Sequence, residues 1–168
     1  MKPSILITGG SGLLALNWAV TVRESFDVTL ALHDRQASLL GVKTVQLNLE
    51  LTDTIQRELE NLRPDIVVHA AGLTSVETCE ENPTLARIVN VDLARNLAIA
   101  CAKLQIPMVH ISTDHLFQGK EAFADESFSV NPINIYGKTK AEAEVKVLES
   151  NPNALVVRTN FYGWGTSY

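Results

Sequence analysis

The chain has 168 residues, of which 46% are hydrophobic and 20% are charged. These proportions are ordinary for a globular domain that buries a core, and they argue against a disordered chain. The net charge of -5 argues against a nucleic-acid partner, because phosphate binding requires clustered lysine and arginine.

The two cysteines and the apolar runs bear on the compartment. Cys79 and Cys101 have neither metal-ligand nor Cys-x-x-Cys spacing. No apolar run approaches membrane-spanning length, and residues 5–7 are too short for the core of a signal peptide. We therefore expect a reduced, cytoplasmic protein that contacts no membrane.

The first half of the chain alternates expected strands and helices. A short apolar run that ends in glycines is typical of a buried strand, and an approximate stripe of Leu13, Leu16, Val20 and Phe26 predicts a helix after it. Asp53 and Gln56 have capping-box spacing and predict the start of the next helix. The expected strands are residues 4–8, 28–32, 42–47 and 65–70, and the expected helices are residues 13–25 and 53–62.

The second half continues the alternation. It contains expected helices at 83–105 and 133–150, and expected strands at 107–112 and 155–158, with a long polar loop at 114–132. Strands separated by helices predict a parallel sheet that is covered on both faces. The predicted fold class is therefore α/β, a Rossmann-type doubly wound parallel sheet.

A glycine-rich segment at residues 8–12 joins the first strand to the first helix. Its glycines permit a tight turn, so that backbone N–H groups at the helix start can approach a pyrophosphate. Many turns carry glycine for conformation alone, but a place between strand and helix is the context that a dinucleotide-binding motif needs. Ala15 stands where a third glycine often packs the helix against the strand. We predict that this turn binds NAD or NADP.

The residues after the second strand should decide between these two cofactors. A carboxylate there holds the ribose 2′-hydroxyl of NAD, whereas an arginine accommodates the 2′-phosphate of NADP. The chain offers both, as Asp34 and Arg35, and each could equally belong to a solvated polar turn. Arg35 favours NADP, with NAD as the alternative.

Tyr136 and Lys140 point most strongly to catalysis. In a helix they lie one turn apart on one face, where an ammonium would lower the pKa of the phenol. The spacing alone often arises by chance, but Ser112 and Thr113 follow a strand, at the edge where open α/β sheets place ligands. A hydroxyl there can bind a substrate carbonyl while Tyr136 protonates its oxygen. Without Tyr136 and Lys140, Thr113 would be interpreted as the cap of a turn.

The four histidines do not indicate a metal site. His69 and His110 fall within apolar strands, where packing is the expected role, and His33 and His115 fall in expected loops. None of them pairs at metal-ligand spacing, and no serine stands in a nucleophile-elbow sequence. We expect neither a metal nor a Ser-His-Asp triad.

With these residues in hand, the chain resembles the extended short-chain dehydrogenase/reductase family, and within it the dTDP-4-dehydrorhamnose reductases. The likeness covers nearly the whole chain and rests on ordered segments at residues 8–12, 65–72, 112–119 and 131–140. Ser-Thr-Asp followed by Phe-x-Gly, within residues 112–119, is the part most particular to the reductase branch.

The resemblance implies a role for each matching residue. Thr113, Tyr136 and Lys140 match the catalytic triad of the family, with Tyr136 as general acid and Lys140 also at the nicotinamide ribose. The expected cofactor-binding residues are Gly9, Ser11, Gly12, Leu13, Leu14, Asp34, Arg35, Asn48, Leu49, Ala70, Ala71, Gly72, Ser112, Tyr136 and Lys140. Two departures are Asn48, where the family commonly has aspartate, and His115, where it commonly has tyrosine.

The implied function is NADP(H)- or NAD(H)-dependent reduction of a nucleotide-linked keto-sugar, in a protein that could form a homodimer. Two alternatives stay open: an epimerase of the same family, and a non-catalytic dinucleotide-binding subunit like the regulatory subunit of methionine adenosyltransferase. Family members are considerably longer, and residues 160–168 are aromatic and glycine-rich without a closing helix. We therefore expect residues 1–168 to be a Rossmann domain that lacks the carboxyl-terminal substrate-binding part.

Overall fold

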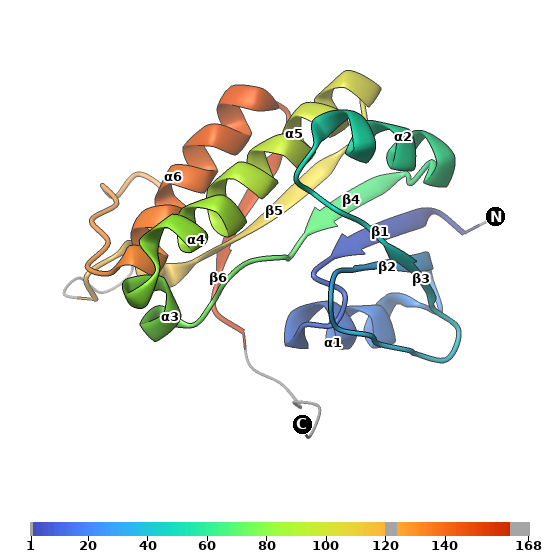
Figure 1. Ribbon diagram of the computed structural model, residues 1–168, viewed down its shortest axis with the longest axis horizontal. Helices are drawn as coiled ribbons and strands as arrows, with labels where there is room; N and C mark the ends of the chain where they lie inside the picture. Colours follow the sequence, from blue (N-terminus) through green and yellow to red (C-terminus); the bar gives the residue numbers. More distant parts are fainter. Residues whose placement is uncertain (1, 120–123, 162–168) are drawn as a thin grey trace.

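The computed structural model describes residues 2–119 and 124–161, so most of the aromatic ending, residues 162–168, lies outside the described part. Within the described residues, six parallel strands form one sheet in the order β3-β2-β1-β4-β5-β6 (Figure 1). This order, which grows outward in both directions from β1 and β4, confirms the predicted Rossmann-type fold. The strands are β1 (Ser4–Thr8), β2 (Asp27–Leu32), β3 (Lys43–Gln46), β4 (Ile66–His69), β5 (Met108–Thr113) and β6 (Leu155–Thr159).

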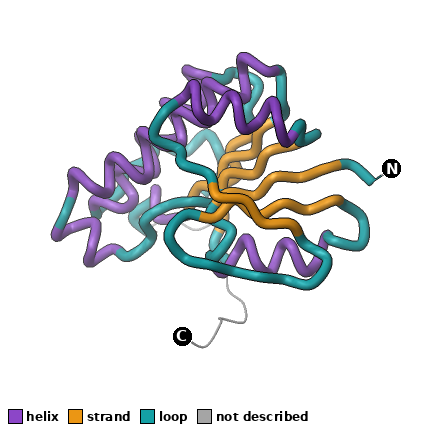
Figure 2. The backbone as a smooth tube through the Cα atoms, turned by 45° about the vertical axis from the view of Figure 1, so that its right-hand side comes forward, coloured by secondary structure: helices purple, strands orange, loops and turns teal. Residues whose placement is uncertain are grey.

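Helices lie on both faces of the sheet, as predicted, but unequally. The first helix covers one face, while the second, fifth and sixth cover the other (Figures 1 and 2). The helices are α1 (Leu13–Val22), α2 (Thr52–Leu62), α3 (Val76–Glu81), α4 (Pro83–Arg87), α5 (Leu93–Leu104) and α6 (Ile135–Ser150), with a π-helical turn η1 (Ile88–Asp92) and a 3-10 turn η2 (Asp114–Leu116).

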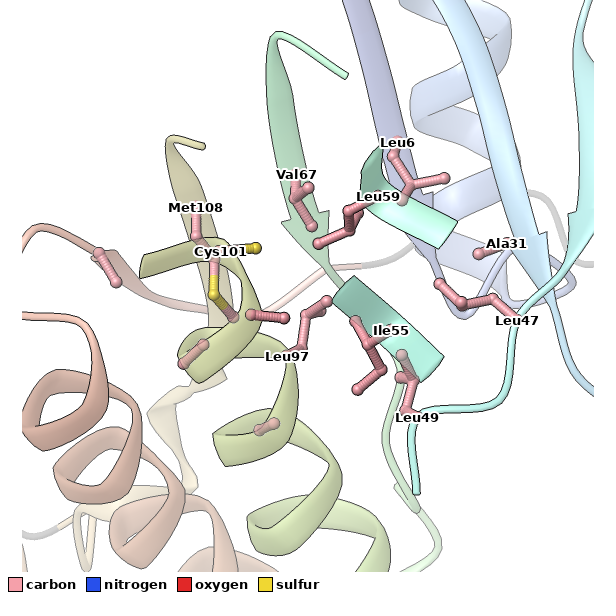
Figure 3. Packing of buried hydrophobic residues seen from close by; sticks show 14 of the residues in the cluster. Leu6, Ala31, Leu47, Leu49, Ile55, Leu59, Val67, Leu97, Cys101 and Met108 are labelled. Carbon is pink, nitrogen blue, oxygen red and sulfur yellow. The ribbon is translucent and has the colours of Figure 1, made fainter. Parts of the chain in front are cut away.

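The larger hydrophobic core lies between the sheet and the pair α2 and α5. Figure 3 shows Leu6 and Val67, from neighbouring strands, in one cluster with Leu59 of α2 and Leu97 of α5. All four side chains are fully buried. Burial of a leucine or valine side chain stabilises a fold by roughly 2 kcal/mol, so this cluster fixes the two helices on the sheet.

The face of α1 that packs on the sheet differs from the predicted one. The predicted stripe included Val20, but Val20 is 46% exposed, and the buried residues of α1 are Ala15 and Ala19. Small side chains allow the helix to lie close to the sheet directly after the glycine turn. The stripe prediction was therefore wrong for Val20, whereas Leu16 and Phe26 pack against the core as expected, and the helix ends at Val22 rather than at residue 25.

Two other local predictions also need correction. The helix expected from Asp53 begins at Thr52, and its N-cap Leu51 makes no side-chain capping bond, so the predicted capping box does not form. The single helix expected over residues 83–105 is interrupted by the π turn at 88–92, which turns Asn90 and Val91 into the interior. π turns inside helices are rare and often accompany functional sites.

The described residues contain neither a membrane-spanning helix nor a cluster of metal ligands. Among the described helices, none combines the length and the apolar character that crossing a membrane requires. In the same residues, no group of three His, Cys, Asp or Glu side chains could hold a metal ion. Cys79 and Cys101 are buried free thiols.

Candidate active site

The glycine turn is shaped by a close approach between two strand ends. Gly9 adopts φ +68°, and a methyl group on it would lie 2.8 Å from both Cα and N of Ala71, which follows β4. The N–H of Gly12 donates to Gly9 O over 2.8 Å and closes the turn. Glycine is required at position 9 because a side chain would meet backbone atoms that cannot move aside.

The amino end of α1 has the properties of an anion site. Its N-cap, Gly12, offers no side-chain acceptor to the first-turn N–H groups, and the first turn carries no acidic residue. The helix dipole adds partial positive charge at this end. The turn therefore fits a pyrophosphate that approaches Ser11, Leu13 and Leu14.

The expected selectivity residues follow β2 at the exposed rim of the sheet. Asp34 lies 3.1 Å from His33 Nδ1 and has an 87% exposed side chain. Arg35 follows it in the same exposed turn. Both residues are exposed, so their burial does not distinguish between the two cofactors.

The residues expected at the adenine differ in accessibility. Asn48 is exposed, and its Oδ1 accepts a hydrogen bond from Glu50 N over 2.7 Å. Leu49 is only 7% exposed and belongs to the core cluster below α2 and α5. Asn96 of α5 donates to Leu49 O and Glu50 O and thereby fixes this loop. Asn48 is thus the member of the pair that is available to a base.

The segment after β4 is bound to its neighbours on both sides. Ala71 N donates to Thr8 Oγ1 over 3.3 Å, which fastens the segment to the end of β1. Leu73 N donates to Asn90 Oδ1 over 2.7 Å, and Asn90 Nδ2 donates to Leu73 O. Ala70, Ala71 and Gly72 therefore form a fixed backbone next to the glycine turn.

Asn90 is the site residue that sequence reasoning missed. It is buried, and besides its bonds to Leu73 it donates to Thr139 Oγ1 over 3.0 Å, so it ties the β4 segment to α6. The Asn90 side chain reaches both because the π turn directs it inward. The only signal in the sequence was a polar residue inside an apolar helical pattern.

Thr113 is the last residue of β5, and its hydroxyl lies between the turn η2 and the start of α6. Its hydroxyl accepts from His115 N over 3.2 Å and so caps the 3-10 turn η2. The same hydroxyl donates to Asp114 Oδ1 over 3.3 Å. Burial raises the pKa of the nearby Tyr136 phenol, and Thr113 counteracts part of that upward shift. Thr113 therefore caps a turn and also lies close to Tyr136. Ser112 is buried as well, but its hydroxyl has no hydrogen-bond partner among the described residues.

Tyr136 is half-buried near the start of α6 and is held edge-on against the His115 ring, with centroids 5.5 Å apart. Burial raises its pKa above 10, and the carboxylate of Asp114 and the thiol of Cys79 raise it further. The predicted lowering by Lys140 was therefore wrong for this arrangement. At neutral pH the phenol keeps its proton, which suits a proton donor.

Lys140 lies on the same side of α6 as Tyr136, but its ammonium is turned inward. Nζ donates to Ile111 O over 2.6 Å and lies 3.4 Å from His110 Nε2. Its residue is 5% exposed, and burial lowers its pKa to about 8, a shift that Glu144 partly offsets. Lys140 is therefore poised between charged and neutral forms close to physiological pH.

The carboxyl ends of parallel strands meet at one edge of a sheet, so the glycine turn after β1, the segment after β4 and Thr113 after β5 share that edge. The class that this arrangement defines is the Rossmann-type α/β domain. Residues 1–164 match the family described as the RmlD substrate binding domain. The chain belongs to this family, within the extended short-chain dehydrogenases/reductases.

Relatives and solved structures agree with this assignment. The chain is 32% identical to a probable low-salt glycan biosynthesis reductase of Haloferax volcanii, over 94% of this chain and 53% of the relative. It is 32% identical to methionine adenosyltransferase 2 subunit beta of Bos taurus, over 92% of this chain and 45% of the relative. A crystal structure of dTDP-4-dehydrorhamnose reductase from Bacillus anthracis in complex with NADP superposes with a TM-score of 0.79 at 30% identity, covering 94% of this chain and 53% of that chain.

The matched region is only part of each relative. The chain spans about half the length of the curated relatives that it matches. Epimerases such as the UDP-glucose 4-epimerase of Brucella ovis, at 19% identity and a TM-score of 0.82, share the fold.

Proposed function

We propose that this chain is the dinucleotide-binding and catalytic part of a reductase that uses NADPH to reduce a nucleotide-linked keto-sugar. The observation that carries the proposal is that α6 places Tyr136 against His115, two residues after Thr113, and Lys140 on Ile111 of β5, at the sheet edge that also holds the uncapped start of α1. A cofactor whose pyrophosphate lies at α1 would extend along this edge towards Tyr136.

Each residue of the proposed triad has a separate task. When bound, NADPH supplies the hydride that adds to the carbonyl carbon. The Thr113 hydroxyl orients the carbonyl oxygen, and the protonated phenol of Tyr136 donates a proton to that oxygen. In this structure Lys140 Nζ is bound to Ile111 O, and with NADPH bound we expect the ammonium to support the negative charge that Tyr136 acquires after the transfer. Burial of Thr113 and Lys140 limits their exchange with water.

The experiment that tests this function uses the full-length protein with NADPH and dTDP-4-dehydrorhamnose. Loss of NADPH absorbance should match formation of the reduced sugar one to one. An epimerase would convert its substrate without net loss of NADPH, because it recycles the cofactor. Absence of any NADPH-dependent turnover of nucleotide-linked keto-sugars would refute the reductase proposal.

Arg35 should give the protein a preference for NADPH over NADH. An arginine that binds the 2′-phosphate contributes a charge-assisted hydrogen bond, so Arg35→Ala should weaken NADPH binding by roughly tenfold or more and leave NADH binding nearly unchanged. Fluorescence titration with both cofactors measures the two affinities. Asp34→Ala is the matched control, because it removes the neighbouring charge and should weaken NADH instead. An unchanged ratio in both variants would contradict the assignment.

One alternative has a specific observation behind it, namely the 32% identity to methionine adenosyltransferase 2 subunit beta. In such a role the dinucleotide site would persist while turnover would not matter. The presence of Thr113, Tyr136 and Lys140 together favours the enzyme. Co-purification of the full-length protein with an adenosyltransferase, together with absence of turnover, would reverse this ranking.

Further aspects of the proposal concern the rest of the protein. We propose that residues 1–168 form the Rossmann domain and that the half of the relatives' length not spanned here supplies the nucleotide-sugar pocket. The buried free thiols of Cys79 and Cys101 agree with a reducing, cytoplasmic setting. Sedimentation of the full-length protein would test whether it forms a homodimer.

A further inference from the structure

Four buried polar residues form a row beneath the proposed site, one from each of four elements. Thr8 of β1 lies 2.7 Å from His69 of β4, measured from Oγ1 to Nδ1. The His69 ring stacks on the His110 ring of β5, with centroids 5.3 Å apart and planes at 24°. His110 Nε2 lies 3.4 Å from Lys140 Nζ of α6. We call Thr8, His69, His110 and Lys140 the buried polar row.

Packing alone does not explain why two histidines occupy these buried positions. Both histidines are fully buried, and within the described residues His69 Nε2 and His110 Nδ1 have no hydrogen-bond partner. Burial lowers the pKa of His69 to about 3 and that of His110 well below 6.5, so both rings are neutral. An apolar ring would fill the same volume without leaving polar atoms unpaired.

His110 offers Lys140 a hydrogen-bond acceptor, which an apolar ring could not offer. An ammonium has three N–H donors and no acceptor, and the buried Nζ donates one of them to Ile111 O over 2.6 Å. A neutral imidazole nitrogen that carries no proton can accept a hydrogen bond from a second N–H of the ammonium. The Ile111 carbonyl alone would leave Nζ free to swing about one bond, whereas two acceptors fix its direction.

We propose that His110 is a positioning residue that holds the Lys140 ammonium against β5, one helical turn from Tyr136, with Nε2 as the acceptor and the ring proton on Nδ1. The proposal rests on the proposed function, in which Lys140 supports the Tyr136 phenolate. His110 itself contacts neither substrate nor cofactor. It acts through Lys140, and His69 with Thr8 supports the ring from the other side.

Loss of this acceptor has a defined consequence for pH dependence. Without His110 the buried ammonium is less stabilised, so the pKa of Lys140 falls below about 8 and the lysine becomes neutral at lower pH. The alkaline limb of the rate profile therefore moves to lower pH. Titratable or charged groups lie on every element around this part of α6. They are His69 on β4, His110 on β5, Glu77, Cys79, Glu80 and Glu81 on α3, Arg87 on α4, Asp92 on η1, Arg95, Cys101 and Lys103 on α5, Asp114 and His115 on η2, Arg158 on β6, and Tyr136, Lys138, Glu142, Glu144, Lys146 and Glu149 on α6 itself.

Among these groups, Glu144 raises the pKa of Lys140 and is itself bound by Arg158, with Nη2 and Oε2 2.8 Å apart. The two histidines are neutral in this range and contribute no charge. The alkaline limb is therefore assigned to Lys140 only if Glu144→Gln also moves it to lower pH. Such a shift would identify the titrating group independently of His110.

The matched pair His110→Phe and His110→Gln tests the proposal in the full-length protein. Phe keeps a ring of similar size without an acceptor, whereas the Gln amide oxygen restores an acceptor. His110→Phe should reduce kcat about tenfold and move the alkaline limb down by roughly one pH unit. His110→Gln should recover most of both effects. A wild-type profile in His110→Phe, or equal defects in the two variants, would overturn the proposal.

A measurement on the unaltered protein covers the case in which His110→Phe does not fold. Nitrogen NMR of the imidazoles distinguishes the two neutral tautomers, and the proposal requires His110 to carry its proton on Nδ1. A proton on Nε2 would overturn it. This readout does not depend on turnover, so failure of the reductase function and failure of the His110 contact are distinguishable.

Discussion

Tyr136→Phe should reduce turnover of the full-length protein by about a hundredfold to ten-thousandfold and leave NADPH binding nearly unchanged. The expected loss is that of a general acid whose proton is transferred in the rate-determining step. The phenol is suited to this task because burial raises its pKa, so it stays protonated at neutral pH, and because its ring is held edge-on against His115. Phe keeps the ring and its edge-on contact with His115, so the change removes little besides the proton.

Steady-state kinetics and a fluorescence titration with NADPH measure the two sides of this prediction. Lys138→Ala is a suitable control, because Lys138 lies on the same turn of α6 as Tyr136 but is exposed. It should retain full turnover. If Tyr136→Phe retained turnover as well, the proton would come from another donor and the assignment of Tyr136 would be refuted.

The sheet could be predicted from the sequence because each strand is a short apolar run between punctuating residues. Residues 66–68, Ile-Val-Val, sit between Pro64 and the glycine at position 72, and they form β4 as expected. His69 and His110 were expected within strands and are fully buried. These features depend on local composition, which the sequence records directly.

Features that depend on contacts between distant segments were not predictable in this way. The packed face of α1 is set by how closely the glycine turn brings the helix to the sheet, so Ala15 and Ala19 are buried although larger residues form the stripe. The inward turn of Lys140 depends on an acceptor at Ile111, 29 positions away in the chain. The spacing of Tyr136 and Lys140 predicts that they share a helix face, but it does not predict the direction of the Lys140 ammonium.

The same distinction explains the pKa of Tyr136. The sequence places a lysine one turn away, and that alone predicts a lowered value. The structure adds burial and the nearby Asp114, and these effects raise the pKa. Asp114 and His115 of η2 and Cys79 of α3 lie near the phenol, and these are two short elements that the sequence pattern did not indicate as structured.

Gly9→Ala should destabilise the chain by about 3 kcal/mol and abolish NADPH binding. Two costs add at this position. A non-glycine residue at φ +68° pays about 1 kcal/mol or more for the left-handed conformation. The added methyl would also lie 2.8 Å from Cα and N of Ala71, so the glycine turn and the segment after β4 must move apart. That movement displaces the N–H groups at the start of α1 that would bind the pyrophosphate.

Gly41→Ala separates the two costs, because Gly41 has φ +78° but no atom lies within 4 Å of the position that its methyl would occupy. It should lose only the conformational term, about 1 kcal/mol, and keep full affinity for NADPH. Urea unfolding curves and NADPH titrations of both variants measure the two effects. Equal destabilisation would mean that the close approach of Gly9 to Ala71 contributes nothing. Retained NADPH binding by Gly9→Ala would mean that the glycine turn serves folding alone, and the dinucleotide site would then have to lie elsewhere on the sheet edge.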